Sequence, residues 1–98
     1  MIPISFLLCS LETEEERDKL SEIYERYLPL MTYFAEAIVG KYNAEEDVVH
    51  DMVIQLVRNL DKIDPDNDVK TREYIRKVTI SRSVDWLRRE STAWRPRT

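Results

Sequence analysis

Cationic side chains recur at helical spacing between residues 74 and 89, near the end of the 98-residue chain. At about 100° per residue, one side of a helix here combines cations, short polar groups and an aromatic ring. Its members are Tyr74, Lys77, Ser81, Arg82, Asp85, Arg88 and Arg89, with Val78 among them. Cations pair with phosphates, while polar and aromatic groups contact bases, so this face suits a nucleic acid. The alternative is arginine that complements the dipole of a helix end, which explains Lys77 and Arg82 poorly.

A second polar arc lies on the preceding predicted helix, from about residue 44 to residue 60. Its apolar side carries Val48, Val49, Met52, Val53, Leu56, Val57 and Leu60. The opposite side carries Asp47, His50, Asp51, Ile54, Gln55 and Arg58. Ile54 is the one aliphatic residue in this arc. It is either an ordinary exposed side chain or the centre of a protein contact, and the sequence favours neither.

No catalytic or metal-binding constellation accompanies these two faces. His50 is the only histidine and has no cysteine or second histidine nearby to share a metal. The acidic stretch from Asp61 to Asp68 lacks the glycine and terminal glutamate of a calcium loop, so it is interpreted as a solvated turn. Gly40 is the single glycine, which excludes a glycine-rich phosphate loop. We therefore expect a protein that is not an enzyme and needs no cofactor or metal.

Charge is divided unevenly along the chain. The net charge is −4, yet residues 1–68 hold 16 acidic and 6 basic side chains, whereas residues 69–98 hold 3 acidic and 9 basic ones. This asymmetry predicts two opposed surfaces for two kinds of partner, one of them a polyanion. A solvated acidic face with a basic tail is the alternative. The lone Cys9 favours a reducing, cytoplasmic setting.

Three helical patterns must position these residues, within one small domain. The first begins with the capping-box pair Thr13 and Glu16 and continues to Gly40, with Pro29 predicting a kink or two helices in series. Asn43 with Glu46 is expected to begin the second helix. Asp68 or Thr71 is expected to cap the third, from about residue 69 to residue 90. The buried side of that helix should carry Ile75, Thr79, Ile80, Ser83, Trp86 and Leu87. The fold class is all-α, a small bundle of three main helices.

Three motifs in this order resemble region two of bacterial RNA polymerase sigma factors, most closely the extracytoplasmic-function group. Residues 40–54 are similar to the family's Gly-x4-Ala-Glu-Asp-Leu-Val-Gln-Glu-Val-Phe. Residues 58–63 resemble Arg-x-Leu-Asp-x-Phe, and residues 74–89 resemble Trp-Leu-x-x-Ile-Ala-x-Asn-x-x-Ile-Asp-x-Leu-Arg-Arg. The resemblance covers residues 18–90, roughly the whole bundle, and implies a sigma-factor role in transcription initiation.

The resemblance also implies how the two faces are used. The polar arc of the second helix (Asp47, His50, Asp51, Ile54, Gln55 and Arg58) would dock on the clamp helices of the largest subunit of core RNA polymerase. The third helix and the loop around residues 66–71 would capture the non-template strand of the minus-ten promoter element. This assigns DNA binding to Thr71, Tyr74, Lys77, Ser81, Arg82, Asp85, Arg88 and Arg89. Ser81 stands where many relatives carry asparagine, and Thr71 where they often carry an aromatic residue, so the base preference stays open.

The expected domain organisation has three parts. Residues 1–12 are an apolar segment that docks on the bundle, residues 13–91 are the helical domain, and residues 92–98 are a tail or the start of a linker. Members of the family usually continue into a second helical domain, so the chain is either a domain of a longer sigma factor, which we favour, or a standalone region two. An anti-sigma factor is a further implied partner, and no membrane contact is expected. The alternative function is a helical interaction module or co-sigma subunit without direct DNA binding.

Overall fold

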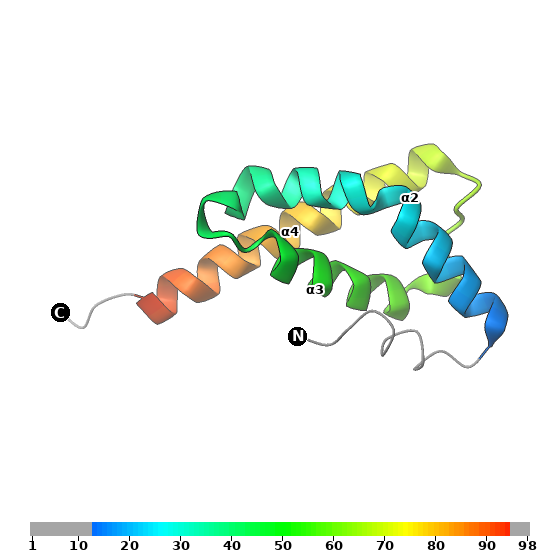
Figure 1. Ribbon diagram of the computed structural model, residues 1–98, viewed down its shortest axis with the longest axis horizontal. Helices are drawn as coiled ribbons and strands as arrows, with labels where there is room; N and C mark the ends of the chain where they lie inside the picture. Colours follow the sequence, from blue (N-terminus) through cyan, green and yellow to red (C-terminus); the bar gives the residue numbers. More distant parts are fainter. Residues whose placement is uncertain (1–12, 95–98) are drawn as a thin grey trace.

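Three long helices make up the part of the chain that the structure describes. The computed structural model describes the backbone of residues 13–94 and the side chains of residues 13–90. Helix α2 (Glu14–Val39) leads through the short 3-10 helix η1 (Gly40–Tyr42) into α3 (Glu45–Arg58), and a second 3-10 helix, η2 (Leu60–Lys62), precedes α4 (Asp68–Trp94) (Figure 1). The expected all-α bundle of three main helices is confirmed. The predicted docking segment 1–12 and residues 95–98 lie outside the described residues.

Helix α2 begins and bends where the sequence predicts. The side-chain oxygen of Thr13 accepts from the Glu16 backbone, and the Glu16 carboxylate accepts from the Thr13 backbone, so the capping box is complete. Pro29 lies inside the helix, which is assigned as one continuous element. Figure 1 shows α2 changing direction between its blue and cyan parts. A proline that lacks an N–H and clashes with the preceding turn accounts for such a bend.

The turn between α2 and α3 differs from the prediction. Gly40 has a right-handed backbone (φ −60°), so its freedom to adopt positive φ is not used. Asn43 instead adopts the left-handed conformation (φ 56°), which asparagine tolerates better than most residues. Ala44 occupies the N-cap of α3, where no side chain caps the helix. The expectation that Asn43 would cap α3 was therefore wrong, because its left-handed backbone forms the turn and Ala44 precedes the helix.

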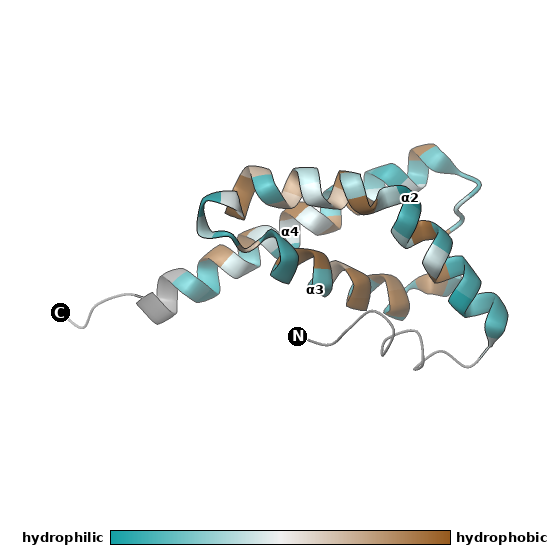
Figure 2. Cartoon of the chain, in the orientation of Figure 1, coloured by the Kyte–Doolittle hydropathy of each residue, from teal (hydrophilic) through white to brown (hydrophobic). Residues whose placement is uncertain are grey.

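Two buried clusters hold the helices together. The larger one joins α2, α3 and the first half of α4, with Leu20, Ile23, Met31, Met52, Leu56 and Ile75 fully buried. The smaller one joins the end of α2 to the start of α3, through Ala35, Val39, Ala44 and Val48. Trp86 and Leu87 of α4 pack against this second cluster. Figure 2 shows hydrophobic residues along α3 and hydrophilic residues over the first turns of α2.

Helix α4 contributes a narrow buried stripe. Among the described side chains of α4, up to residue 90, four are fully or almost fully buried, and they recur at every fourth position: Thr71, Ile75, Thr79 and Ser83. Ile80, Trp86 and Leu87 are only half-buried, and Tyr74 and Val78 pack on the larger cluster although the sequence placed them on the polar face. The predicted burial of Ile75, Thr79 and Ser83 is confirmed, and Thr71 is the buried residue that the projection missed. Steps of four residues advance by about 40° around the helix, so the stripe winds along α4.

Asn67, not Asp68 or Thr71, caps the start of α4. Its side-chain Oδ1 accepts from the Lys70 backbone at 3.2 Å, and its carbonyl accepts from the Thr71 backbone at 3.0 Å. Asp68 is already the first residue of the helix, where its charge complements the dipole. At the other end α4 continues to Trp94, four residues beyond the predicted end at residue 90.

None of the helices within residues 13–94 has the length and apolar character needed to cross a membrane.

The buried hydroxyl of Thr79 yields the first testable prediction. Its Oγ1 atom is buried and has no hydrogen-bond partner, so it bears the cost of desolvation without compensation. The Thr79→Val variant should therefore raise the free energy of unfolding by about 1 kcal/mol in urea titrations. Ser83→Ala is the matched control, because the Ser83 hydroxyl donates to the Thr79 carbonyl at 2.8 Å and its loss should not stabilise the fold. A less stable Thr79→Val variant would contradict the prediction.

Candidate nucleic-acid and protein interfaces

The cationic face of α4 is organised around Asp85. The Asp85 carboxylate forms ion pairs with two guanidinium groups: Arg82 at an N···O distance of 2.7 Å and Arg88 at 3.9 Å. Arg82 keeps about a third of its side chain exposed (34%), and its Nε atom is buried without a hydrogen-bond partner. The Arg88 side chain is 77% exposed. Ser81 and Lys77, about one and two helical turns before Asp85, are both exposed. The predicted row of polar and cationic groups thus lies on the surface.

These ion pairs leave the cations able to bind phosphate. Exposed pairs of this kind contribute only about 0–1 kcal/mol, because water and salt screen them. A phosphate that approaches Arg88 competes with a carboxylate that is itself partly solvated. Arg82 is held more firmly, since part of its guanidinium faces inward. Not all of its donors are therefore accessible to a phosphate.

The polar arc of α3 meets the cationic face of α4 along one edge. The Arg89 guanidinium lies 3.5 Å from the Asp51 carboxylate, which joins the two helices. Asp47, His50 and Asp51 of α3 line a shallow pocket together with Trp86 and Arg89 of α4. The sequence predicted two opposed surfaces, and this expectation was wrong: the surfaces adjoin, because the end of α4 packs beside the start of α3. Ile54 and Gln55 are half-buried, and Arg58 is exposed at the far end of the arc.

A second pocket lies where η2, the following loop and the first turns of α4 meet. Its volume is about 410 Å³, within the range of roughly 300–1,000 Å³ that is usual for small-ligand sites. Amide, ammonium and phenol groups surround it: the lining residues are Asn59, Lys62, Ile63, Asp64, Asn67, Lys70, Thr71 and Tyr74. We call it the loop pocket. Its groups can hydrogen-bond to and stack on a flat polar ring.

The structure places Thr71 and Tyr74 in the wall of this pocket rather than on the open face of α4. Thr71 is 3% exposed, and its hydroxyl donates to the Asp64 carbonyl at 2.8 Å, so that hydroxyl is already used within the loop. The Tyr74 hydroxyl accepts from Asn59 Nδ2 at 3.3 Å. Burial raises the pKa of the Tyr74 phenol, although the Asn59 hydrogen bond acts in the opposite direction. Tyr74 therefore stays a neutral donor beside the pocket.

Asn59 and Lys62 are pocket residues that the sequence analysis did not assign to DNA binding. Asn67 and Lys70 also line the pocket, and they lie in the loop around residues 66–71 that was expected to capture the strand. Two lysines and two asparagines around an acidic turn were the available signal, because such side chains hydrogen-bond to bases and phosphates. Among residues 13–90, no group of three or more His, Cys, Asp or Glu side chains could hold a metal ion.

The geometry defines a small helical binding domain with one polar arc, one cationic face and a loop pocket between helices. Residues 23–93 match the family model for sigma-70 region 2, so the chain belongs to the sigma-70 region 2 family. It is a sigma-factor domain with a role in transcription initiation, where region 2 binds core RNA polymerase and promoter DNA and catalyses no reaction itself. No curated protein and no solved structure matches the chain.

Two phenols give the fold a predictable response to high pH. Burial raises the pKa of Tyr27 and of Tyr74 above the ordinary 10.0, and for Tyr27 the hydrogen bond to Asp68 adds to the effect. The folded state therefore holds these protons more tightly than the unfolded chain. Their contribution is fully present below the unfolded pKa and is lost as the pH rises through the folded pKa.

The free energy of unfolding in urea should consequently fall as the pH rises above about 10, the unfolded pKa of a phenol. A Tyr27→Phe, Tyr74→Phe double variant should lose less stability over this range. Tyr33→Phe should behave like the parent chain, because its ring is 67% exposed. If the parent chain, the double variant and Tyr33→Phe lose equal free energy of unfolding, the two buried phenols are excluded as the cause.

Proposed function

We propose that this chain is the promoter-opening and polymerase-binding domain of an alternative sigma factor of the extracytoplasmic-function type. The observation that carries the proposal is the exposed row of Lys77, Ser81 and Arg88 that leads along α4 to the loop pocket. Such a row tracks a nucleic-acid backbone, while the pocket accommodates a base that has left the stack. The motifs shared with the extracytoplasmic-function group support the subtype.

Strand opening in this proposal is driven by binding alone. Unpairing and unstacking a base costs a few kcal/mol, and capture in a pocket offsets that cost. Stacking of a base on an aromatic side chain contributes about 1–3 kcal/mol, and Tyr74 is the aromatic ring in the wall of the loop pocket. The non-template strand of the minus-ten element would run from Arg88 and Lys77 toward this pocket. Thr71 would shape the pocket through the loop rather than contact the strand.

Core polymerase docks on the polar arc of α3 in the same proposal. Ile54 lies half-buried between polar neighbours, as expected for an apolar contact surrounded by charges. Asp47, Asp51 and Arg58 provide charges of both signs for the clamp helices of the largest subunit. Since Arg89 pairs with Asp51, the docking surface continues directly into the DNA surface. An anti-sigma factor that covers this shared edge would block both partners.

We infer that residues 13–91 form the domain; the family model spans residues 23–93. The single cysteine, Cys9, favours a cytoplasmic sigma factor.

A second candidate is a helical interaction module or co-sigma subunit that does not touch DNA. The observation that favours it is the pairing of Arg82, Arg88 and Arg89 with carboxylates of the domain itself. In that case the ion pairs serve only to fix the end of α4. The two candidates differ in how binding to single-stranded DNA responds to salt.

A single-stranded minus-ten oligonucleotide, titrated at several salt concentrations, tests the DNA surface. Affinity should fall log-linearly with salt, because phosphate contacts release counterions. Lys77→Ala and Arg88→Ala should each flatten the salt slope by roughly one unit, and Arg82→Ala by less, owing to its inward-facing guanidinium. Arg17→Ala, on the first turns of α2, is the control cation and should leave the slope unchanged. No binding by the parent chain at any salt would favour the interaction module.

Pull-down of core RNA polymerase tests the docking arc. Ile54→Glu should abolish the interaction by burying a carboxylate in the contact, while the circular dichroism spectrum and thermal unfolding stay close to those of the parent. Val69→Glu is the matched control, because it makes the same substitution at an aliphatic residue that is 80% exposed at the start of α4. Normal recovery of polymerase by Ile54→Glu would reject the docking arc.

A further inference from the structure

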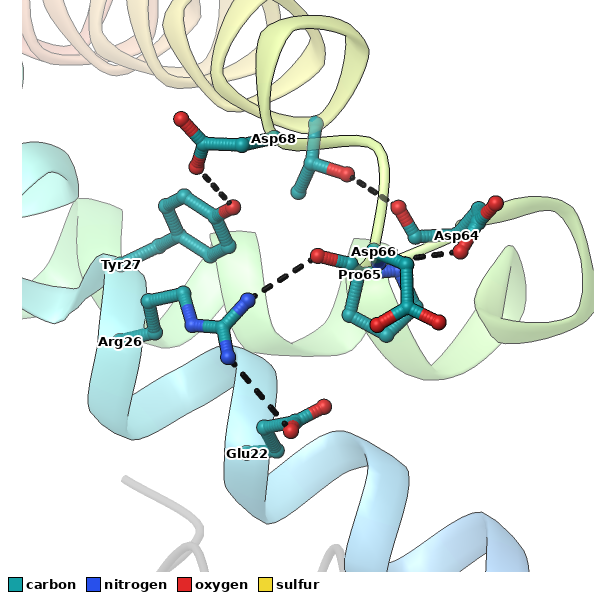
Figure 3. Close-up of polar contacts among 8 residues, drawn as sticks. Glu22, Arg26, Tyr27, Asp64, Pro65, Asp66 and Asp68 are labelled. Carbon is teal, nitrogen blue, oxygen red and sulfur yellow. Dashed lines mark hydrogen bonds and ion pairs between the residues drawn. The ribbon is translucent and has the colours of Figure 1, made fainter.

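Two side chains of α2 reach across to the segment that forms one wall of the loop pocket. We call residues 63–67, between η2 and α4, the capture loop. The Tyr27 hydroxyl donates to Asp68 Oδ1 at 2.6 Å, directly after this loop. Arg26 Nη1 donates to the Pro65 carbonyl within it at 3.0 Å (Figure 3). Both bonds join residues about 40 positions apart, so they fix the loop to a different part of the fold.

The capture loop is otherwise held by its own polar groups. The Asp64 carboxylate accepts from the Asp66 backbone at 3.0 Å, and the Asp64 carbonyl accepts from both the Asn67 backbone and the Thr71 hydroxyl. Ile63 is the one apolar residue of the loop that is buried in the core. A polar segment of this kind gains little from hydrophobic burial, while ordering each residue costs about 1–2 kcal/mol. Its shape therefore depends on hydrogen bonds, both those within the loop and those donated to it from α2.

Tyr27 is well suited to provide such a bond. Its ring is 3% exposed within the larger core cluster, so the hydroxyl has a fixed direction. Burial and the neighbouring Asp68 raise the pKa of the phenol, which keeps it a donor at physiological pH. Arg26 is exposed, but the Glu22 carboxylate at 3.6 Å restrains its guanidinium on the side away from the loop, as Figure 3 shows.

Neither residue borders the loop pocket. The lining comes from Asn59, which caps the end of α3, and from η2, the capture loop and α4, whereas Tyr27 and Arg26 approach the loop from α2. They line a separate hollow together with Pro29, Leu30, Tyr33, Asp68 and Arg72. Any influence of Tyr27 or Arg26 on a base in the loop pocket must therefore pass through the position of the capture loop.

We propose that Tyr27 and Arg26 are positioning residues that hold the capture loop in the shape needed to receive a base of single-stranded DNA. The inference rests on the proposed function, and it assigns to α2 a role in DNA capture beyond its part in the core. A loop that is ordered before binding spares the complex the entropy of ordering it. Loss of either hydrogen bond should weaken strand binding without removing any contact to phosphate.

Tyr27→Phe in the full chain tests the inference, with Tyr33→Phe as the matched control on the same helix. The variant keeps the buried ring and loses only the hydroxyl that reaches Asp68. Amide hydrogen exchange should accelerate at Asp66 and Asn67 relative to the control. Affinity for the single-stranded minus-ten oligonucleotide should fall by about 3- to 10-fold, the effect of one lost hydrogen bond, with the salt slope unchanged.

Arg26→Ala repeats the test at an exposed position, where the fold is not at risk. Glu22→Ala is its control, because that change removes the ion-pair partner of Arg26 but leaves the bond to Pro65 possible. Arg26→Ala should accelerate exchange in the capture loop and weaken strand binding, and Glu22→Ala should do so to a much smaller extent.

The outcomes separate this inference from the proposed function. Unchanged exchange in the capture loop of both Tyr27→Phe and Arg26→Ala would overturn the positioning role. Faster exchange with undiminished strand affinity would overturn it as well, since the loop would then not need to be held. If the parent chain binds no single-stranded DNA, the proposed function and the positioning role for DNA fail together, whereas hydrogen exchange still decides whether α2 fixes the loop.

Discussion

The narrow contact that α4 makes with the rest of the bundle determines most of what this domain can do. Thr71, Ile75, Thr79 and Ser83 form a buried stripe only one residue wide, and three of the four are small polar residues. Small side chains allow a close approach between helices, so this narrow line of contact is enough to pack a long helix against the bundle. Tyr74, Val78, Trp86 and Leu87 are half-buried beside this stripe, and the cationic face of α4 stays exposed. A domain of this size can therefore present a row of cations and still maintain a core.

The elements with local signals were predictable from the sequence. A capping box needs only residues three apart, and apolar spacing defines one face of a helix without reference to its neighbours. The start of α2 at Thr13 and the all-α fold follow from these signals. Residues Lys77, Ser81 and Arg88 of the cationic face are exposed as expected, because their side of α4 lies opposite the buried stripe.

Features that depend on the crossing of helices were not predictable in this way. The sequence could not show that Tyr74 turns toward Asn59, or that Arg89 reaches Asp51, because each contact joins two helices whose relative placement is a property of the whole fold. The same holds for Asn67: several residues in an Asp- and Asn-rich loop can cap a helix, and the packing of the loop selects one. The loop pocket escaped notice for the same reason.

The bend at Pro29 has a geometric consequence for the first helix. A straight helix can follow only one direction of the bundle, whereas the bend divides α2 into two arms, one before and one after Pro29, that run in different directions. In the first arm, Lys19 donates to the Leu60 carbonyl and Arg26 to the Pro65 carbonyl. These two hydrogen bonds hold the segment between α3 and α4. The second arm carries Ala35 and Val39 into the packing against α3. A single proline thus lets one helix contact both the segment before α4 and the start of α3.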